Sequence, residues 1–293
     1  MLNTKKMTMM KTRLYITNTF HALIKGTIIN EEQHLDGYFL LDSACSNNIL
    51  NKHIGIKVKD NNKDSKSFAT LNCQETVASS TNLQISINGN ETEEEMSIIE
   101  CNHELFLNPS LPVLGILGIT YLVNHKICID YENMMMYELP IDRDWSLFKT
   151  RCPFTFGIRK YGIAVVGIEN GIEDNVMMTL LDTGSNLNIV CKQALNAYPF
   201  EHSIIDKIQD ISDVNTSSAM KGCILDFSLV MIEDEKMYCK PMKEEFYIDE
   251  YKEYLLREEG AKQIEAIIGN KFMISNKCML DFSTGYMYSS IWG

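Results

Sequence analysis

The sequence has little basic charge and no long apolar run, and these absences exclude several classes of protein. Among 293 residues, 27 Lys and Arg stand against 39 Asp and Glu, which gives a net charge of -12. Nucleic acids and anionic membrane surfaces bind basic patches, so this balance argues against both as partners. A membrane-spanning helix needs about 20 consecutive apolar residues, and no run approaches that length. We therefore expect no nucleic-acid partner and no membrane association.

The sequence also lacks the short motifs of metal, nucleotide and disulfide sites. Its nine cysteines are an odd number without a CxxC pair, which favours reduced thiols over a disulfide framework or a zinc site. No HExxH, GxxxxGK[ST] or GxGxxG motif occurs. The basic N-terminus is not followed by the apolar segment of a signal peptide. These features predict an acidic, cytoplasmic, globular protein that needs no metal and no cofactor.

Two further kinds of side chain are set aside as candidate catalytic groups. A cysteine-protease interpretation is disfavoured because Cys45 lies beside Asp42, which would raise the thiol pKa rather than lower it. The six histidines are isolated in the sequence and are interpreted as surface or hydrogen-bonded side chains: His21, His34, His53, His103, His125 and His202.

What the sequence does contain is an internal repeat. Residues 37–50 (GYFLLDSACSNNIL) match residues 177–190 (MMTLLDTGSNLNIV). The alignment places Asp42 opposite Asp182, an offset of 140, with Leu-Leu before and Asn-Ile after each aspartate. Self-similarity of this kind indicates a duplicated structural unit.

A second pair of matching blocks follows in the same order. Residues 115–131 match residues 266–282 and align Gly118 with Gly269, an offset of 151. The second copy therefore has eleven more residues than the first between its two blocks. We place this insertion at Met242–Gln263, a charged stretch of helix-forming composition.

Each copy consists mainly of short apolar runs of strand type, so we expect a mainly β protein. Short helices are expected after Gly118, after Gly269, at Lys192–Ala197 and over 244–258 in the insertion. The predicted organisation is a tail at 1–13, a first lobe at 14–140, a linker at 141–153 and a second lobe at 154–293.

The residues around Asp182 carry a specific chemical pattern. An apolar strand at 176–181 delivers this carboxylate to the interior, Thr183 supplies a buried hydroxyl, and Gly184 allows a tight turn. The first copy has Asp42-Ser-Ala at the same place, and each copy has an apolar-apolar-Gly downstream. Together these residues resemble the aspartic proteases of the pepsin and retropepsin type.

That resemblance implies a two-lobed acid-protease β-barrel fold with pseudo-two-fold symmetry and a short helical insertion in lobe two. Asp42 and Asp182 would be the catalytic pair, and Ser43 and Thr183 would tie the two loops together. Two like charges about 3 Å apart cannot both ionise, so one carboxyl stays protonated and polarises the scissile carbonyl. The other deprotonates a water molecule. The supporting active-site loops would contain Ser43, Ala44, Thr183, Gly184, Ser185, Gly118 and Gly269.

The resemblance also implies partners. An aspartic endopeptidase cleaves a peptide or protein substrate held in a cleft between the lobes, without metal or cofactor. A duplicated chain supplies both halves, so we expect a monomer with an intramolecular pseudo-dimer. Mobile hairpins over the cleft would have their tips near Glu75–Asn82 and Val214–Lys221.

The first copy departs from the family pattern at Ala44, where glycine is expected. Alanine disfavours a positive φ, so the sequence does not determine the conformation of this loop. The alternative function is therefore a non-catalytic, peptide-binding pseudoprotease that keeps the two-lobed fold. The copies also differ at Cys45 and Ser185, because a thiol is a weaker donor than a hydroxyl. If these groups bond the carboxylates, Asp182 is the more acidic partner and Asp42 holds the shared proton.

Overall fold

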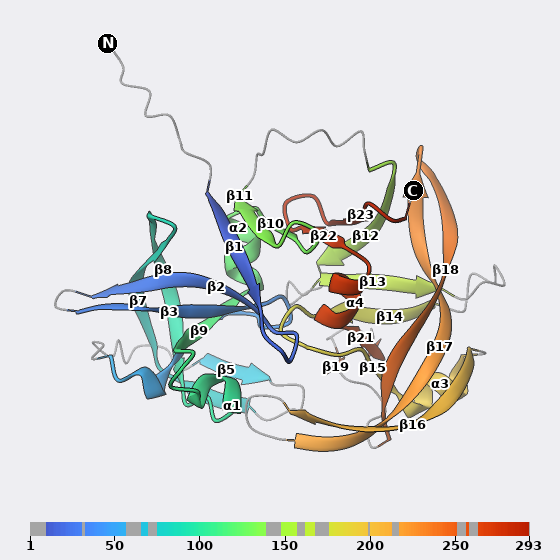
Figure 1. The fold of residues 1–293 in the computed structure, drawn as a ribbon, viewed down its shortest axis with the longest axis horizontal. Helices are drawn as coiled ribbons and strands as arrows, with labels where there is room; N and C mark the ends of the chain where they lie inside the picture. Colours follow the sequence, from blue (N-terminus) through green and yellow to red (C-terminus); the bar gives the residue numbers. More distant parts are fainter. Residues whose placement is uncertain are drawn as a thin grey trace, which may run out of the picture.

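The structure is a computed structural model, and it describes residues 10–30, 33–56, 66–69, 75–138, 148–156, 162–167, 176–198, 200–212, 217–250, 256–257 and 263–292. These residues form a mainly β protein with a few short helices. In Figure 1 the strands of the first half, blue to green, lie on one side, and those of the second half, yellow to red, lie on the other. The predicted mainly β, two-lobed fold is confirmed.

The first half contains eleven strands, two α-helices and one 3₁₀ helix in its described part. The strands are β1 Lys11–Ile16, β2 Ala22–Asn30, β3 Gln33–Asp42, β4 Asn48–Asn51, β5 Lys66–Ala69, β6 Glu75–Ala78, β7 Ser80–Ile87, β8 Asn90–Ile99, β9 Val113–Gly118, β10 Ile127–Asp130 and β11 Met135–Glu138. The helices are η1 Lys52–Ile54, α1 Glu104–Leu107 and α2 Ile119–Asn124.

The second half repeats this order with longer central strands. Its strands are β12 Thr150–Phe156, β13 Gly162–Gly167, β14 Val176–Leu181, β15 Ile189–Cys191, β16 Glu201–Ser212, β17 Ser217–Glu233, β18 Lys236–Asp249, β19 Leu256–Arg257, β20 Gln263–Ile264, β21 Ala266–Ile268, β22 Cys278–Asp281 and β23 Tyr286–Ser289. Its helices are α3 Lys192–Ala197 and α4 Asn270–Ser275. The short helices expected after Gly118, after Gly269 and at Lys192–Ala197 are therefore confirmed, and none of these is long and apolar enough to cross a bilayer.

The strand topology of the two halves is the same around the candidate site. In the first half β3 runs parallel to β9, and β4 lies antiparallel to β9 and parallel to β8. In the second half β14, β21, β15 and β18 repeat these three pairings. The apolar residues before each aspartate, Leu41 and Leu181, are buried against the same large cluster. Burial of both faces explains why these segments read as continuous apolar runs.

One sheet joins the halves. Strand β10 pairs antiparallel with β22, so that Ile129 lies opposite Leu280. With the flanking pairs, this gives the six-stranded order β1–β11–β10–β22–β23–β12 across the boundary. Backbone bonds from Tyr131 N to Cys278 O and from Phe282 N to Ile127 O, 2.9 and 3.0 Å, close this joint. The two halves therefore form one body through a continuous hydrogen-bonded sheet.

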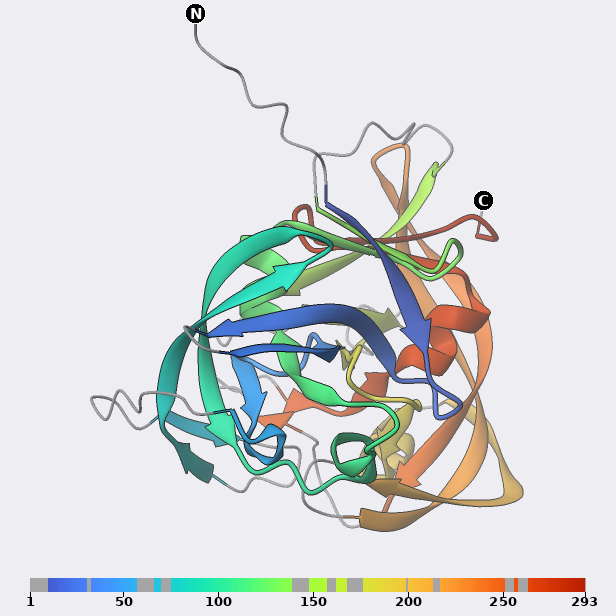
Figure 2. The same cartoon turned by 60° about the vertical axis from the view of Figure 1, so that its left-hand side comes forward.

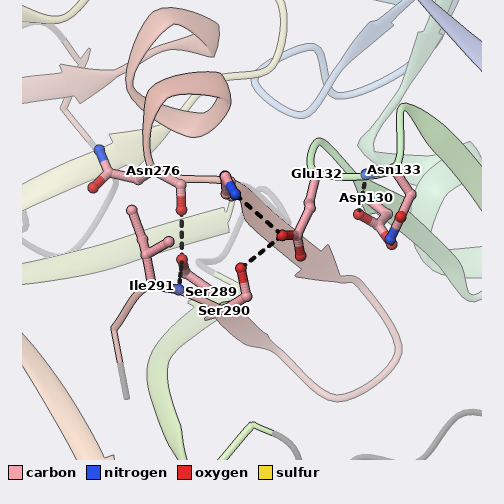
Figure 3. Close-up of polar contacts among 8 residues, drawn as sticks. Asp130, Glu132, Asn133, Asn276, Ser289, Ser290 and Ile291 are labelled. Carbon is pink, nitrogen blue, oxygen red and sulfur yellow. Dashed lines mark hydrogen bonds and ion pairs between the residues drawn. The ribbon is translucent and has the colours of Figure 1, made fainter.

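A polar contact reinforces this joint at the turn after β10 (Figure 3). Glu132 accepts a hydrogen bond from the hydroxyl of Ser290 at 2.9 Å and lies 3.4 Å from the ammonium group of Lys277. All three side chains are partly exposed to solvent, so this contact is worth little energy by itself. It marks the side on which the end of the second half meets the first.

The helix predicted over 244–258 is wrong in the residues that the structure describes. Glu244–Asp249 belongs to β18, which runs antiparallel to β17 and parallel to β15, and Leu256–Arg257 is the short strand β19. Consecutive burial of Phe246, Tyr247 and Ile248 between two strands overrides the helical spacing of the apolar residues. Residues 251–255 and 258–262 lie outside the described ranges.

The extra residues of the second copy also lie elsewhere than predicted. Ser97 and Tyr247 hold equivalent places, because each pairs with the strand that follows its Asp loop. Ser97 is seven residues past Asn90, the first residue of its strand, whereas Tyr247 is eleven past Lys236. Each arm of hairpin β17–β18 is thus four residues longer than the corresponding arm of hairpin β7–β8, which accounts for eight of the eleven extra residues. Figure 2 shows its orange tip reaching β12, with which β17 pairs at Thr150.

The predicted domain limits differ from the strands at two points. Residues 11–13, assigned to the tail, belong to β1 and pair with β11. Residues 150–153, assigned to the linker, belong to β12 and pair with β23 and β17. Polar residues hide both strands in the sequence: Lys11 and Arg13 are exposed on either side of buried Thr12, and Thr150 is buried next to Arg151. Residues 1–9 and 139–147 lie outside the described ranges.

Candidate active site

The structure brings the two repeat aspartates together. Asp42 is the last residue of β3 and Asp182 directly follows β14, so each parallel strand delivers one carboxylate to the boundary between the halves. Each carboxyl group alters the pKa of the other, so the two lie close together. The backbone of Gly184 in the second half also packs directly against the carboxyl group of Asp42. Residues 140 positions apart in sequence therefore form a single polar centre.

Each carboxylate is held by its own loop in the same way. Oδ1 of Asp42 accepts from the backbone N–H groups of Ala44 and Cys45, both at 2.9 Å. Oδ1 of Asp182 accepts from the N–H groups of Gly184 and Ser185 at 2.8 and 3.0 Å. Backbone donors have little freedom to reorganise, so both carboxylates are fixed in orientation before any ligand arrives.

The residues after the aspartates join the two loops across the boundary. The Ser43 N–H donates to Oγ1 of Thr183 at 2.9 Å, and the Thr183 N–H donates to Oγ of Ser43 at 3.0 Å. Each hydroxyl in turn donates to the opposite strand, Ser43 to Leu181 O at 2.6 Å and Thr183 to Leu41 O at 3.0 Å. Both side chains are fully buried. Ser43 and Thr183 thus make the reciprocal cross-boundary contacts that were expected of them.

Two asparagines that sequence analysis did not assign support the loops from behind. Oδ1 of Asn48 accepts from Gly118 N, and Oδ1 of Asn188 accepts from Gly269 N, both at 3.0 Å. A side chain on either glycine would collide with the carbonyls of the adjacent Asp loop. The signal was present in the repeat, because an Asn-Ile pair follows each aspartate at the same distance.

A third missed residue breaks the symmetry. Asn270 is fully buried, its Nδ2 donates to Thr183 O at 2.6 Å, and its Oδ1 accepts from the hydroxyl of Tyr131. The counterparts of these residues in the other half, by the offset of 151, are Ile119 and Phe282, which have no polar groups. Among the residues that the structure describes, only the Asp182 loop is therefore tied by a polar side chain to the turn that follows β10.

The departure at Ala44 leaves its loop geometry intact. Among the described residues Ala44 does not have a positive φ, and neither does Gly184. The N–H of Ala44 donates to Asp42 just as that of Gly184 donates to Asp182. The side chain of Ala44 packs against the main apolar cluster. The position in the first half therefore accepts a methyl group, whereas Gly184 faces a carboxyl group.

The hydrogen bond predicted from the Ser185 hydroxyl to a carboxylate is wrong. The Ser185 hydroxyl donates to Leu187 O at 2.9 Å, and the Cys45 thiol points in the same way to Asn47 O at 3.1 Å. Both groups close their own turn rather than bonding an aspartate. The reason is local, because a carbonyl two residues ahead lies closer than the carboxylate, which already has two backbone donors.

This geometry changes what substitution at these positions should do. Ser185→Ala and Cys45→Ser should leave the acidic limb of the pH–rate profile in place, because neither side chain bonds a carboxylate. Ser185→Ala should lower the free energy of unfolding by about 1 kcal/mol through loss of one turn hydrogen bond. Urea unfolding and a pH series of initial rates check both effects. A shift of the limb in opposite directions for the two variants would contradict the geometry.

Burial sets the ionisation of the pair. It raises the pKa of Asp42, against the effect of the two backbone donors of its own loop. Burial, and then the charge of Asp42, raises the pKa of Asp182 well above its ordinary value. Asp182 is only 4% exposed, whereas Asp42 is partly open to solvent. The more buried carboxyl keeps a shared proton more readily, so burial favours Asp182 as its holder, opposite to the order expected from the hydroxyl and the thiol.

Burial also makes the neighbouring thiol of Cys45 unreactive. Burial, and then the charge of Asp42, raises the pKa of Cys45 well above its ordinary value. A thiol of this kind is not a thiolate nucleophile near neutral pH. Within the described ranges, no three His, Cys, Asp or Glu side chains group as metal ligands.

A hairpin lies between the Asp loop and the later glycine in each half. In the first half it is β5–β6, and the predicted tip at Glu75–Asn82 is instead strand β6 and the start of β7. In the second half it is β16–β17. The connection at 213–216 overlaps the predicted Val214–Lys221 and lies outside the described residues, and the rest of the predicted segment is the start of β17. Alternation of Ser and Thr with small apolar residues suits a strand as well as a turn, which explains the misplacement.

Comparison with solved structures agrees with this architecture. The crystal structure of basic 7S globulin from soybean matches with a TM-score of 0.51 over 96% of this chain and 95% of that one, at 10% sequence identity. The two chains share one fold. At this identity the likeness carries no information about activity. No family model matches the sequence, and no curated protein does either.

Proposed function

We propose that this chain is an aspartic endopeptidase that hydrolyses a peptide or protein substrate with Asp42 and Asp182. The observation that carries the proposal is the convergence of two carboxyl groups, one from each half, each oriented by two backbone N–H donors. Two buried carboxyls in contact share one proton over a wide pH range, which is the ionisation state that such hydrolysis needs.

In this mechanism the two carboxyl groups divide the work. The protonated group, which we assign to Asp182, polarises the scissile carbonyl by donating a hydrogen bond to its oxygen. The ionised group, assigned to Asp42, accepts a proton from water, and the resulting nucleophile attacks the carbonyl carbon. The proton then passes to the leaving amine, and the pair returns to its starting state. Both groups come from one chain, so a monomer suffices.

The test combines cleavage with inhibitor sensitivity. The wild-type protein should cleave members of a peptide library, and pepstatin should block this cleavage. Asp42→Asn and Asp182→Asn should each lower kcat by at least about a thousandfold, because neither retains a proton-sharing pair. Peptide binding by the wild type without turnover would instead support the non-catalytic, peptide-binding alternative.

The same two variants carry a control for folding. A buried carboxyl with a raised pKa retains a proton that the unfolded chain loses above about pH 4. Stability therefore falls as the pH rises from there toward the raised pKa values of the pair. Asn removes one ionisable group but can still accept from the loop N–H donors, so each variant should be at least as stable as wild type at pH 7, with a flatter pH dependence. If a variant is unfolded, its loss of cleavage gives no information about the catalytic role of the aspartate.

A further inference from the structure

A partly buried pair of His125 and Glu94 lies behind the Asp42 loop and is not used by the proposed chemistry. Nε2 of His125 lies 2.7 Å from Oε1 of Glu94, whose side chain is 10% exposed. His125 directly follows α2, the helix that begins at Gly118 and Ile119, and its ring lies 4.4 Å from that of Tyr121. His125 is thus a partly buried, hydrogen-bonded side chain, one of the two kinds that the sequence analysis allowed for the histidines.

The pair connects to the Asp42 loop through one side chain. The second oxygen of Glu94 accepts from Nδ2 of Asn48 at 3.2 Å, and Oδ1 of the same Asn48 accepts from Gly118 N. The next residue, Ile119, donates its N–H to Cys45 O at 2.8 Å, and Cys45 N in turn donates to Asp42. Asn48 is 3% exposed, so it has no water to replace a lost partner. A change at Glu94 therefore reaches the candidate dyad through consecutive hydrogen bonds.

In the second half the corresponding glutamate does not bond the asparagine of its loop, because Asn188 Nδ2 donates to the backbone oxygen of Glu245 at 3.0 Å. By the register of β4 with β8 and of β15 with β18, Glu244 is the counterpart of Glu94, and by the offset of 151 Asn276 is the counterpart of His125. Asn276 Nδ2 donates to Glu244 at 2.9 Å. Glu and its partner are thus retained in both halves, but only the first half uses a partner that gains and loses a proton near neutral pH.

Two carboxylates and one ring face His125. Glu94 reaches it from β8, Glu138 of β11 lies 3.8 Å from Nδ1, and Tyr121 contacts it from its own helix. The hydrogen bond to Glu94 raises the pKa of His125 above its ordinary value, and burial opposes this. The imidazolium form is therefore the one that the fold prefers.

We propose that Glu94 and His125 are positioning residues for the Asp42 loop, acting through Asn48, and that this support is pH-dependent in the first half alone. The catalytic consequence rests on the proposed function. Because the histidine pKa is raised on folding, the support is fully present below about pH 6.5 and is lost as the pH rises through the raised value. The Asp182 loop, whose Asn188 bonds a backbone carbonyl instead of a carboxylate, keeps its geometry over the same range.

The decisive measurement follows the two loops without requiring turnover. Amide hydrogen exchange by NMR, from pH 5.5 to 8.5, compares the N–H of Cys45 with its counterpart Ser185. In the wild type the protection of Cys45 relative to Ser185 should fall about three- to tenfold across the titration of His125. His125→Asn, which copies the second half, should abolish this fall. Asn276→His is the matched control and should produce no such fall for Ser185, because Asn188 does not bond Glu244.

Kinetics provides the second readout. His125→Ala should lower kcat about three- to tenfold with KM within about twofold, because the residue acts through another side chain and not on the substrate. His125→Asn should restore kcat and remove the step that His125 adds to the alkaline limb of the pH–kcat profile. A merely structural histidine would change the unfolding midpoint without changing the shape of that profile.

The outcomes separate this inference from the proposed function. A constant ratio of Cys45 to Ser185 protection across the pH range overturns the positioning role, whether or not the protein cleaves peptides. A ratio that moves with pH in the wild type and not in His125→Asn supports the positioning role, even if no cleavage is found. In that last case it is the proposed protease function that fails.

Discussion

Replacing Gly184 by alanine should lower kcat/KM by about a hundredfold or more while the protein remains folded. The added methyl group would lie 2.5 and 2.7 Å from the two carboxylate oxygens of Asp42, so that carboxylate has to move. A displacement of about 1 Å of a reacting group costs roughly a hundredfold in rate. Initial rates on a cleaved peptide, with circular dichroism to verify folding, measure the effect.

The chain offers a matched control in the other half. Ala44 occupies the position equivalent to Gly184, and its methyl group packs against the apolar cluster. The kcat/KM of Ala44→Gly should therefore stay within about threefold of the wild-type value. Glycine gives the unfolded chain more backbone freedom, so this variant should lose stability instead of activity. Full activity in Gly184→Ala would mean that Asp42 is not required where the structure places it.

Thr183→Val should lower the free energy of unfolding by about 3 kcal/mol. Its hydroxyl accepts from Ser43 N and donates to Leu41 O, and valine has the same shape without either function. Both backbone groups would be left buried without partners, at about 1–3 kcal/mol each. Urea unfolding monitored by tryptophan fluorescence gives the value directly.

A second threonine on the neighbouring strand isolates the hydrogen bonds from the change in polarity. Thr179 in β14 is fully buried, and among the described residues its hydroxyl has no hydrogen-bond partner. Thr179→Val should be neutral or stabilising, because it removes a buried polar group that gains nothing in the fold. Equal losses in the two valine variants would show that the cross-boundary bonds carry no special weight.

The duplication and the position of the Asp loops were readable from the sequence for a simple reason. Each loop is made of contiguous residues, from the apolar strand through Asp182 and Thr183 to the asparagine six residues after the aspartate, so its pattern is local. The supporting glycines Gly118 and Gly269 each directly follow apolar residues, so this pattern is also local and can be recognised in a short stretch of sequence. Even the contact between Ser43 and Thr183 follows once the two copies are placed face to face.

Other features were decided by residues far apart in the chain. The predicted helix over 244–258 fails because pairing with β17 and β15 buries Phe246–Ile248 as strand residues, and helical spacing alone does not contain that information. The position of the extra residues depends likewise on strand register. Propensity is a weak preference that a long hairpin partner overrides.

The sequence by itself determined that this protein is a duplicated β protein presenting two aspartates, because that information is local and repeated. The tertiary structure alone decided which carboxyl is more buried, where the Ser185 hydroxyl points, and that His125 meets Glu94 behind the Asp42 loop. Burial and hydrogen bonding are properties of the surroundings that folding builds from distant segments. Those surroundings shift the pKa values of the groups on which the proposed chemistry depends.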